Sequence, residues 1–200
     1  MKSLINQLSK RTKEYLKKKN QITDVVIFGS FMRGKSEPND IDILIIFKDK
    51  LDKDIEYELK NIFLKINKKI SITSIIESNL KKPTFPVREG YLFEGFSLLK
   101  DEPISKRFGF SSFGLFITST KNMENKDRTR YYYTLNGRGT SNGFLKEING
   151  LRLSADLFIV PLESIEKAKE FFEFWRIKTQ YIPFLIPERL GVKGILGRVS

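Results

Sequence analysis

The chain contains no cysteine and no histidine. Without cysteine, disulfides, thiolate metal sites and thiol nucleophiles are all excluded. Without histidine, imidazole is excluded both as a general base and as a metal ligand. Any acid–base or metal chemistry must therefore use carboxylates, lysine, tyrosine or hydroxyl groups. An oxygen-ligated Mg²⁺ or Mn²⁺ site is the metal chemistry that suits such a chain.

Long apolar runs and a secretion signal are also lacking. The most apolar stretch, residues 41–47, has the length of a strand and is too short to cross a bilayer. Residues 1–6 lack the apolar core and the cleavage site of a signal peptide. These features predict a cytoplasmic protein without a membrane partner.

Acidic residues are in the minority. Lys and Arg number 36 against 24 Asp and Glu, which gives a formal net charge of +12. A basic balance of this size indicates a polyanionic partner such as RNA or DNA, or a phosphate-bearing substrate. The alternative is that lysine-rich faces only keep the protein soluble, and charge alone does not decide between the two.

The first hundred residues alternate between helical and strand patterns. Helices are predicted over 3–19, with Ser3 as the N-cap, and over 53–65. Strands are predicted over 24–28, 40–47 and 69–76, with a closing strand inside 91–100. This order predicts an α/β (α+β) domain over residues 1–102.

Beyond the polar step at Asp101-Glu102-Pro103 the composition changes, which places a domain boundary there. Aromatic and β-branched residues dominate 108–118 and 130–135, with glycines between, so strands and turns are predicted. A strand over 157–161 and a helix over 164–176 complete a smaller, β-rich α+β domain over 103–200. The basic tail over 182–200 is expected to extend onto a partner.

Two aspartates open the apolar segment that is predicted as the second strand. Because Asp40 and Asp42 are two residues apart, a strand directs both carboxylates to one face. Two like charges on one face repel each other and are costly to desolvate, and a divalent cation that accepts an oxygen from each relieves both problems. The alternative, a loop-capping Asp40 and a solvent-facing Asp42, does not explain the motif that precedes them.

That preceding motif is a glycine–serine turn followed by a basic loop. Gly29 and Ser30 directly follow the first predicted strand, and Arg33 and Lys35 come shortly after. A glycine lets the backbone approach a phosphate closely, and the serine hydroxyl and nearby N–H groups can donate to phosphate oxygens.

Taken together, these motifs resemble the polymerase-β superfamily, particularly its minimal nucleotidyltransferases, over residues 1–102. The resemblance implies a nucleotidyltransferase-type mixed sheet flanked by helices, and attack of an acceptor hydroxyl on the α-phosphorus of an NTP such as ATP, with pyrophosphate leaving. The residues that would hold the nucleotide are Gly29, Ser30, Arg33 and Lys35. The catalytic residues, which would also hold two Mg²⁺ or Mn²⁺ ions, are Asp40 and Asp42.

One position departs from the family pattern. The third carboxylate is expected on the strand over 69–76, where the matching residue is Ser71, and Glu77 lies roughly 20 Å farther along that strand. Two functions therefore stay open. The first is metal-dependent transfer of an NMP to a hydroxyl, on RNA, protein or a small molecule. The second is a catalytically weak or inactive protein of this fold that binds RNA or a ribonucleoprotein. An antitoxin-like nucleotidyltransferase with a protein partner is a third alternative.

In the second half, basic residues are interleaved with aromatic residues and glycines over 126–139. Arginine contacts phosphates and tyrosine stacks on unpaired bases in many RNA-binding surfaces. The predicted nucleic-acid-binding residues are Arg128, Arg130, Tyr132 and Arg138. The alternative is a sheet with tyrosine on both faces and a polar turn.

Overall fold

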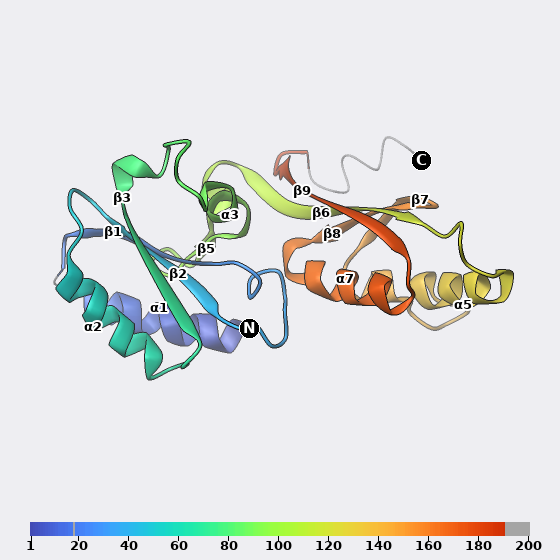
Figure 1. Ribbon diagram of the computed structural model, residues 1–200, viewed down its shortest axis with the longest axis horizontal. Coiled ribbons are helices and arrows are strands. Elements are labelled where there is room, and N and C mark those ends of the chain that lie inside the picture. Colours follow the sequence, from blue (N-terminus) through green and yellow to red (C-terminus); the bar gives the residue numbers. More distant parts are fainter. Residues whose placement is uncertain (18, 191–200) are drawn as a thin grey trace. The chain divides into compact units, whose positions relative to one another are not determined.

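The computed structural model describes residues 1–17 and 19–190. The chain folds as two compact units, of which the first is Met1–Phe108 and the second begins at Gly109 (Figure 1). Expectations for residue 18 and for the end of the basic tail, 191–200, lie outside the described residues. No helix in the described part of the chain is long and apolar enough to cross a membrane.

The first unit contains a mixed five-stranded sheet. Its helices are α1 (Lys2–Leu16), α2 (Lys53–Leu64), α3 (Arg88–Glu94) and α4 (Ile104–Arg107), with a 3-10 turn at Glu77–Asn79. Its strands are β1 (Ile22–Phe28), β2 (Ile41–Phe47), β3 (Ile70–Ile76), β4 (Phe96–Ser97) and β5 (Glu102–Pro103). The strand order is β3-β2-β1-β4-β5, and β2 is antiparallel to β1 but parallel to β3. The predicted α+β fold class with a mixed sheet is confirmed.

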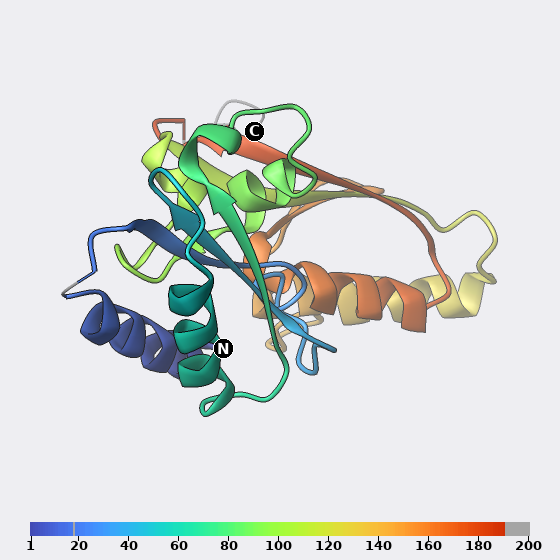
Figure 2. The ribbon, with the colours of Figure 1, turned by 60° about the vertical axis from the view of Figure 1, so that its left-hand side comes forward.

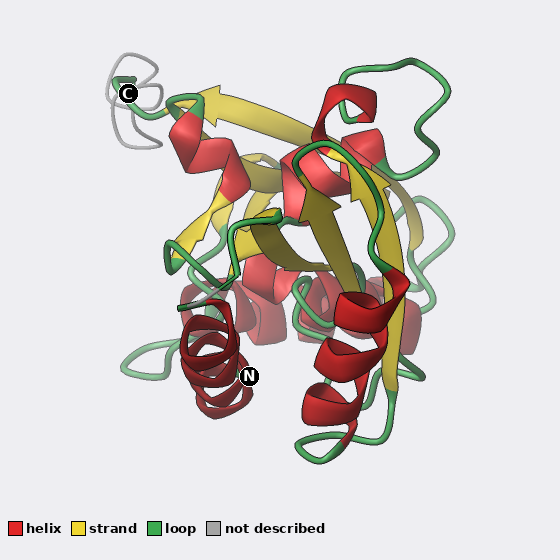
Figure 3. Cartoon of the chain, turned by 90° about the vertical axis from the view of Figure 1, so that its left-hand side faces the viewer, coloured by secondary structure: helices red, strands yellow, loops and turns green. Residues whose placement is uncertain are grey.

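Strand β2, which lies between β3 and β1, is buried on both faces, and this explains its nearly continuous apolar sequence. Ile43 and Ile45 face the layer formed by α1 and α2, and they share a core with Leu8 of α1. Leu44 and Ile46 face the opposite side and pack with α3. Figure 3 shows α1 and α2 together on one side of the strands.

The closing strand predicted inside 91–100 is short, since only Phe96–Ser97 pairs as β4, and the residues before it, Tyr91–Glu94, belong to the unpredicted helix α3. Tyr91 packs against the core on the α3 side of the sheet, which favours a helix in this segment. The first unit also continues past the predicted boundary at Pro103, since β5 pairs with β4 and Ile104 is fully buried in the core of this unit.

Helix α1 begins without the predicted serine cap. Its N-cap is Met1, with no side-chain hydrogen bond to the first turn, and Ser3 lies inside the helix. There the Ser3 hydroxyl accepts a hydrogen bond from the side-chain amide of Gln7. A helix that begins one residue earlier leaves Ser3 no cap position to fill.

A buried ion pair joins the beginning of β1 to the end of α4. The Asp24 carboxylate accepts a hydrogen bond from Arg107 Nη1 at 2.7 Å, one from the Ser97 hydroxyl at 2.7 Å, and one from the Val25 N–H at 2.8 Å. The Asp24 and Arg107 side chains are only 3% and 20% exposed. Since Arg107 also donates to Glu102, the network fixes β1, β4, β5 and α4 to one another.

We expect Arg107→Ala to lower the free energy of unfolding by about 3 kcal/mol, because it leaves the buried Asp24 carboxylate without its cation. Denaturant unfolding monitored by circular dichroism measures this loss. The control is Arg130→Ala, which removes an exposed arginine 3.8 Å from Asp127 and should change stability by less than about 0.5 kcal/mol. Equal stability of the two variants would contradict a stabilising role for the Asp24–Arg107 pair.

The second unit contains an antiparallel sheet of four strands in the order β7-β8-β6-β9. The strands are β6 (Phe110–Ser119), β7 (Leu151–Ser154), β8 (Leu157–Pro161) and β9 (Lys178–Pro187), and the helices are α5 (Asn125–Asn136), α6 (Phe144–Glu147) and α7 (Ile165–Phe174). Helices α5 and α7 lie on the same side of the sheet (Figure 2). Between the sheet and α7, the ring of Phe116 lies 5.4 Å from that of Phe172.

The segment 130–135, predicted as a strand, is helical and belongs to α5. Tyr131 and Leu135 are one helical turn apart and are the buried residues of this helix, which gives α5 one apolar face. The Tyr131 ring packs 5.8 Å from that of Trp175. The helix ends at Asn136, and its C-cap Gly137 has a φ of 87°, which favours glycine. The predicted helix 164–176 is observed as a 3-10 turn, Leu162–Ser164, followed by α7.

Candidate active site

The turn that follows β1 is anchored to the core by two of its own apolar side chains. Phe31 and Met32 are buried in the core that lies between the sheet and helices α1 and α2. Backbone hydrogen bonds close the turn, among them one from the Met32 N–H to the Gly29 carbonyl at 3.0 Å and one from the Gly34 N–H to the Phe31 carbonyl at 3.1 Å. Ser30, which directly precedes the buried Phe31, remains partly exposed. The sequence therefore builds a hydrogen-bonded turn in which Ser30 is partly exposed.

The Asp42 carboxylate lies directly against this turn. In the antiparallel register Asp42 pairs with Phe28, the last residue of β1 before Gly29. A methyl group at Gly29 would lie 2.5 Å from Oδ2 of Asp42, and Gly29 has a φ of 86°. Both the space and the backbone conformation thus require glycine at this position.

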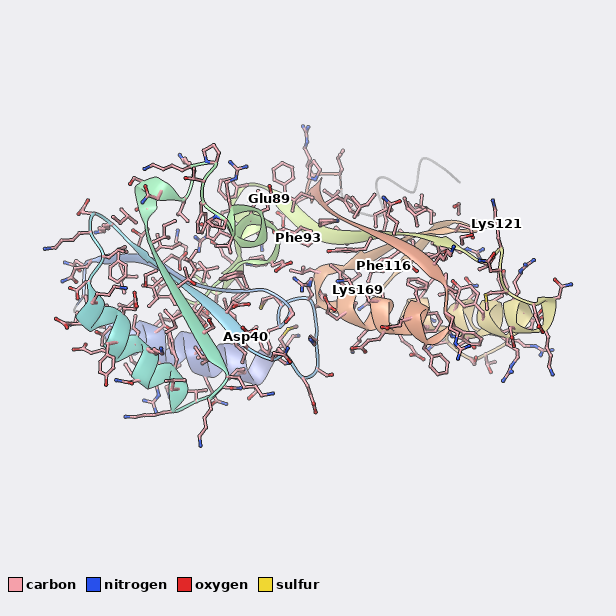
Figure 4. The ribbon with its side chains drawn as sticks, viewed as in Figure 1. Asp40, Glu89, Phe93, Phe116, Lys121 and Lys169 are labelled. Atoms are coloured by element: carbon pink, nitrogen blue, oxygen red, sulfur yellow. The ribbon has the colours of Figure 1, made fainter. Side chains whose placement is uncertain are left out.

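Asp42 and Asp40 are placed together at the beginning of β2. Asp42 shares a sheet face with Leu44 and Ile46, whereas Asp40 lies in the loop, because β2 begins at Ile41 and not at Asp40 as predicted (Figure 4). Burial is the main cause that raises the pKa of Asp42 above its ordinary value, and the charges of Asp40 and Glu94 raise it further. The positive charge of Arg33 lowers the pKa of Asp42.

Glu94 is a residue of this site that the sequence analysis did not identify. Its Oε1 accepts a hydrogen bond from Arg33 Nη1 at 2.5 Å, and the two side chains are 23% and 13% exposed for Arg33 and Glu94. Glu94 is the last residue of α3, a helix that the sequence analysis did not predict because it expected only a closing strand inside 91–100. The signal that was available is the helical spacing of Val87 and Tyr91, which both pack against the core.

Of the other predicted nucleotide-binding residues, Lys35 lies close to the turn, since its N–H donates to the Ser30 carbonyl at 3.2 Å. Both residues are partly exposed. The predicted basic loop therefore follows the Gly29–Ser30 turn in space as well as in sequence.

Ser71 lies next to Asp42 in the parallel register of β2 and β3, and its side chain is exposed. Glu77 cannot take its place, because Glu77 accepts a hydrogen bond from Thr23, at the opposite end of β1 from Gly29. Within residues 1–17 and 19–190, no group of three acidic side chains is placed to hold a metal ion.

The donor set at the beginning of β2 is therefore the carboxylate pair of Asp40 and Asp42. This set suits Mg²⁺, which is usually bound through one or two carboxylates together with substrate phosphates and water. The pKa of Asp42 supports this fit, because a partly buried carboxylate near other acids is stabilised by a cation.

The residues predicted to bind nucleic acid separate into two groups. Arg128 donates to the backbone carbonyls of Thr120 and Met123, so its guanidinium secures the turn before α5. Arg130 is exposed on α5, and Tyr132 and Arg138 are exposed as well.

Residues 10–89 match the family model described as polymerase beta, nucleotidyltransferase. The matched segment includes the Gly29–Ser30 turn, the two aspartates and Ser71. This part of the chain is therefore a nucleotidyltransferase-like domain of the polymerase-β superfamily. A search of curated proteins finds no match to the chain.

Proposed function

We propose that the first unit transfers an NMP from an NTP to an acceptor hydroxyl, on RNA or protein, with Mg²⁺ or Mn²⁺ bound by Asp40 and Asp42. The observation that carries the proposal is the position of the Asp42 carboxylate against Gly29, where burial and neighbouring acids oppose its ionisation. A divalent cation and the phosphates of a nucleotide would complete such a site.

The residues around the pair have distinct roles in this proposal. The Ser30 hydroxyl donates to phosphate oxygens, and the Lys35 ammonium neutralises their charge. Arg33 contributes a second positive charge, and its ion pair with Glu94 fixes the guanidinium at the edge of the turn. Gly29 leaves room for Asp42 beside the turn.

In the proposed reaction, the acceptor oxygen forms a bond to the α-phosphorus while the bond to the bridging oxygen breaks and pyrophosphate leaves. Bound divalent ions supply neutralisation of the charge on the phosphates. Asp40 and Asp42 would hold these ions, while Gly29 and Ser30 would position the triphosphate for in-line attack. Because Ser71 is neutral, the hydroxyl proton passes to water or to a base on the acceptor.

A second candidate function is nucleotide or RNA binding with little or no turnover. The observation that favours it is Ser71, at the β3 position beside Asp42 where a third carboxylate is expected.

The proposal is tested by incubating the protein with each α-labelled NTP, Mg²⁺ or Mn²⁺, and cellular RNA or protein. We expect labelled acceptor with the wild type, and up to about 100-fold less with Gly29→Ala, because the added methyl displaces the Asp42 carboxylate. Gly139→Ala is the matched control, since Gly139 also has a positive φ but has open space around it. Absence of transfer to any acceptor would overturn the enzymatic proposal in favour of the second candidate.

A further inference from the structure

Helix α5 leaves two adjacent tyrosines on the surface of the second unit. Tyr132 and Tyr133 are 48% and 41% exposed, whereas Tyr131 is buried and anchors the helix against Phe171 and Trp175. The rings of Tyr132 and Tyr133 meet edge to face, with their centroids 6.1 Å apart. Since Tyr131 provides the packing, the other two rings are not required by the core.

An arginine guanidinium lies over each of the two exposed rings. The Arg152 guanidinium lies 5.3 Å from the centroid of Tyr132, and the Arg138 guanidinium lies 4.9 Å from that of Tyr133. Arg152 comes from β7, and Arg138 comes from the loop after α5. The four side chains form a continuous series in the order Arg152, Tyr132, Tyr133, Arg138, which we term the Arg–Tyr array.

Hydrogen bonds hold the Arg152 side chain, and Arg138 lies on a tightly closed loop. Arg152 Nε donates to the Ser154 carbonyl at 2.9 Å, and its Nη1 donates to the Asn136 side chain at 3.3 Å. Arg138 directly follows Gly137, where a side chain would collide with the Ser141 carbonyl, so the loop closes tightly at this point. A surface that is already ordered loses less conformational entropy when it binds a ligand.

The surroundings of the array on α5 are basic. Lys126 and Arg130 are exposed on the same helix, and Arg130 lies 3.8 Å from Asp127, the acid in its first turn. Exposed aromatic rings beside arginines are the elements that bind bases and phosphates of unpaired strands.

We propose that the Arg–Tyr array binds single-stranded nucleic acid, with bases stacking on Tyr132 and Tyr133 and phosphates contacting Arg138 and Arg152. A duplex is a poorer ligand, because its bases already stack on one another. The array keeps Tyr132 and Arg138 of the nucleic-acid-binding residues predicted from the sequence and adds Tyr133 and Arg152. Arg128 is not part of it, because its guanidinium donates to backbone carbonyls of the turn before α5. The proposal does not rest on nucleotide transfer by the first unit.

The test is fluorescence anisotropy of the full chain with labelled oligoadenylate of about 12 nucleotides, as RNA and as DNA, in EDTA without NTP. At about 50 mM salt we expect binding of both single strands and weaker binding of the matched duplex. Tyr132→Ala with Tyr133→Ala should weaken binding at least about tenfold, through lost stacking. Arg138→Ala with Arg152→Ala should reduce the log–log salt slope by about 1.4.

Two controls keep this test separate from folding and from the active site. Tyr57→Ala removes a tyrosine that is 67% exposed on α2 of the other unit and should leave the affinity unchanged. Asp42→Asn should also bind the oligonucleotide normally, even if nucleotide transfer is lost. Thermal unfolding verifies that the double variants are folded. Preference for the duplex, no binding at low salt, or equal affinity of the double tyrosine variant and the wild type would overturn the proposal.

Discussion

Ser71→Asp is expected to raise the rate of nucleotide transfer by on the order of 100-fold, because a positioned general base typically contributes at least that much. Ser71 lies beside Asp42 in the register of β2 and β3, so a carboxylate there would join the proposed metal-binding pair. The position is exposed, and the new charge therefore carries little desolvation cost. Single-turnover transfer from labelled NTP to RNA or protein measures the gain.

Two variants separate this effect from a general change in charge or shape. Ser71→Asn has nearly the shape of aspartate without its charge and should leave the rate unchanged. Thr73→Asp places a carboxylate on the same strand about 7 Å farther along and should also have little effect. If the wild type is already fast and Ser71→Asp is neutral, the missing-acid hypothesis is wrong, and Glu94→Gln becomes the next variant to measure.

Asp42→Asn is expected to weaken metal-dependent binding of an NTP by more than about 100-fold. Loss of an outer-shell partner of a metal ligand already costs roughly 10–100-fold in metal affinity, and Asp42 is proposed as a direct ligand. Isothermal titration calorimetry with NTP and Mg²⁺ measures the change, and Asp54→Asn on the exposed side of α2 is the matched control. In EDTA, Asp42→Asn should bind NTP no more weakly than the wild type, because without metal the Asp42 carboxylate only repels the phosphates.

The stability of Asp42→Asn distinguishes a lost ligand from a damaged fold. Because burial and nearby acids raise the pKa of Asp42, its ionised form is less stable in the folded protein than in the unfolded chain. Without metal at neutral pH, removal of the charge should therefore leave the thermal midpoint unchanged or raise it. Unchanged NTP affinity with Mg²⁺ present, in a folded Asp42→Asn variant, would refute the proposed role of this carboxylate.

Some residues of the candidate site could be predicted from the sequence, and others could not. Local patterns were enough to propose the turn and the Asp pair, because a strand followed by Gly29 and two acids two residues apart need no distant partner to be recognised, although Asp40 lies in the loop before β2 and not in the strand. Glu94 required the fold, since it reaches Arg33 from a helix that the sequence analysis did not predict. The Arg–Tyr array likewise required the fold, because Arg152 and Tyr132 are brought together by β7 and α5.

The sequence by itself indicated the apolar strands of the first unit through local patterns, and the resemblance of its motifs to the polymerase-β superfamily implied the mixed sheet and the family that matches residues 10–89. The resemblance also identified Ser71 as the neutral residue where a third carboxylate is expected, and the register of β2 and β3 places it next to Asp42. Only the tertiary structure decided that 130–135 is helical, since the packing of Tyr131 against Phe171 and Trp175 outweighs its strand propensity. It also decided that Ile104 belongs to the first core, because burial of a side chain depends on contacts that no local pattern contains.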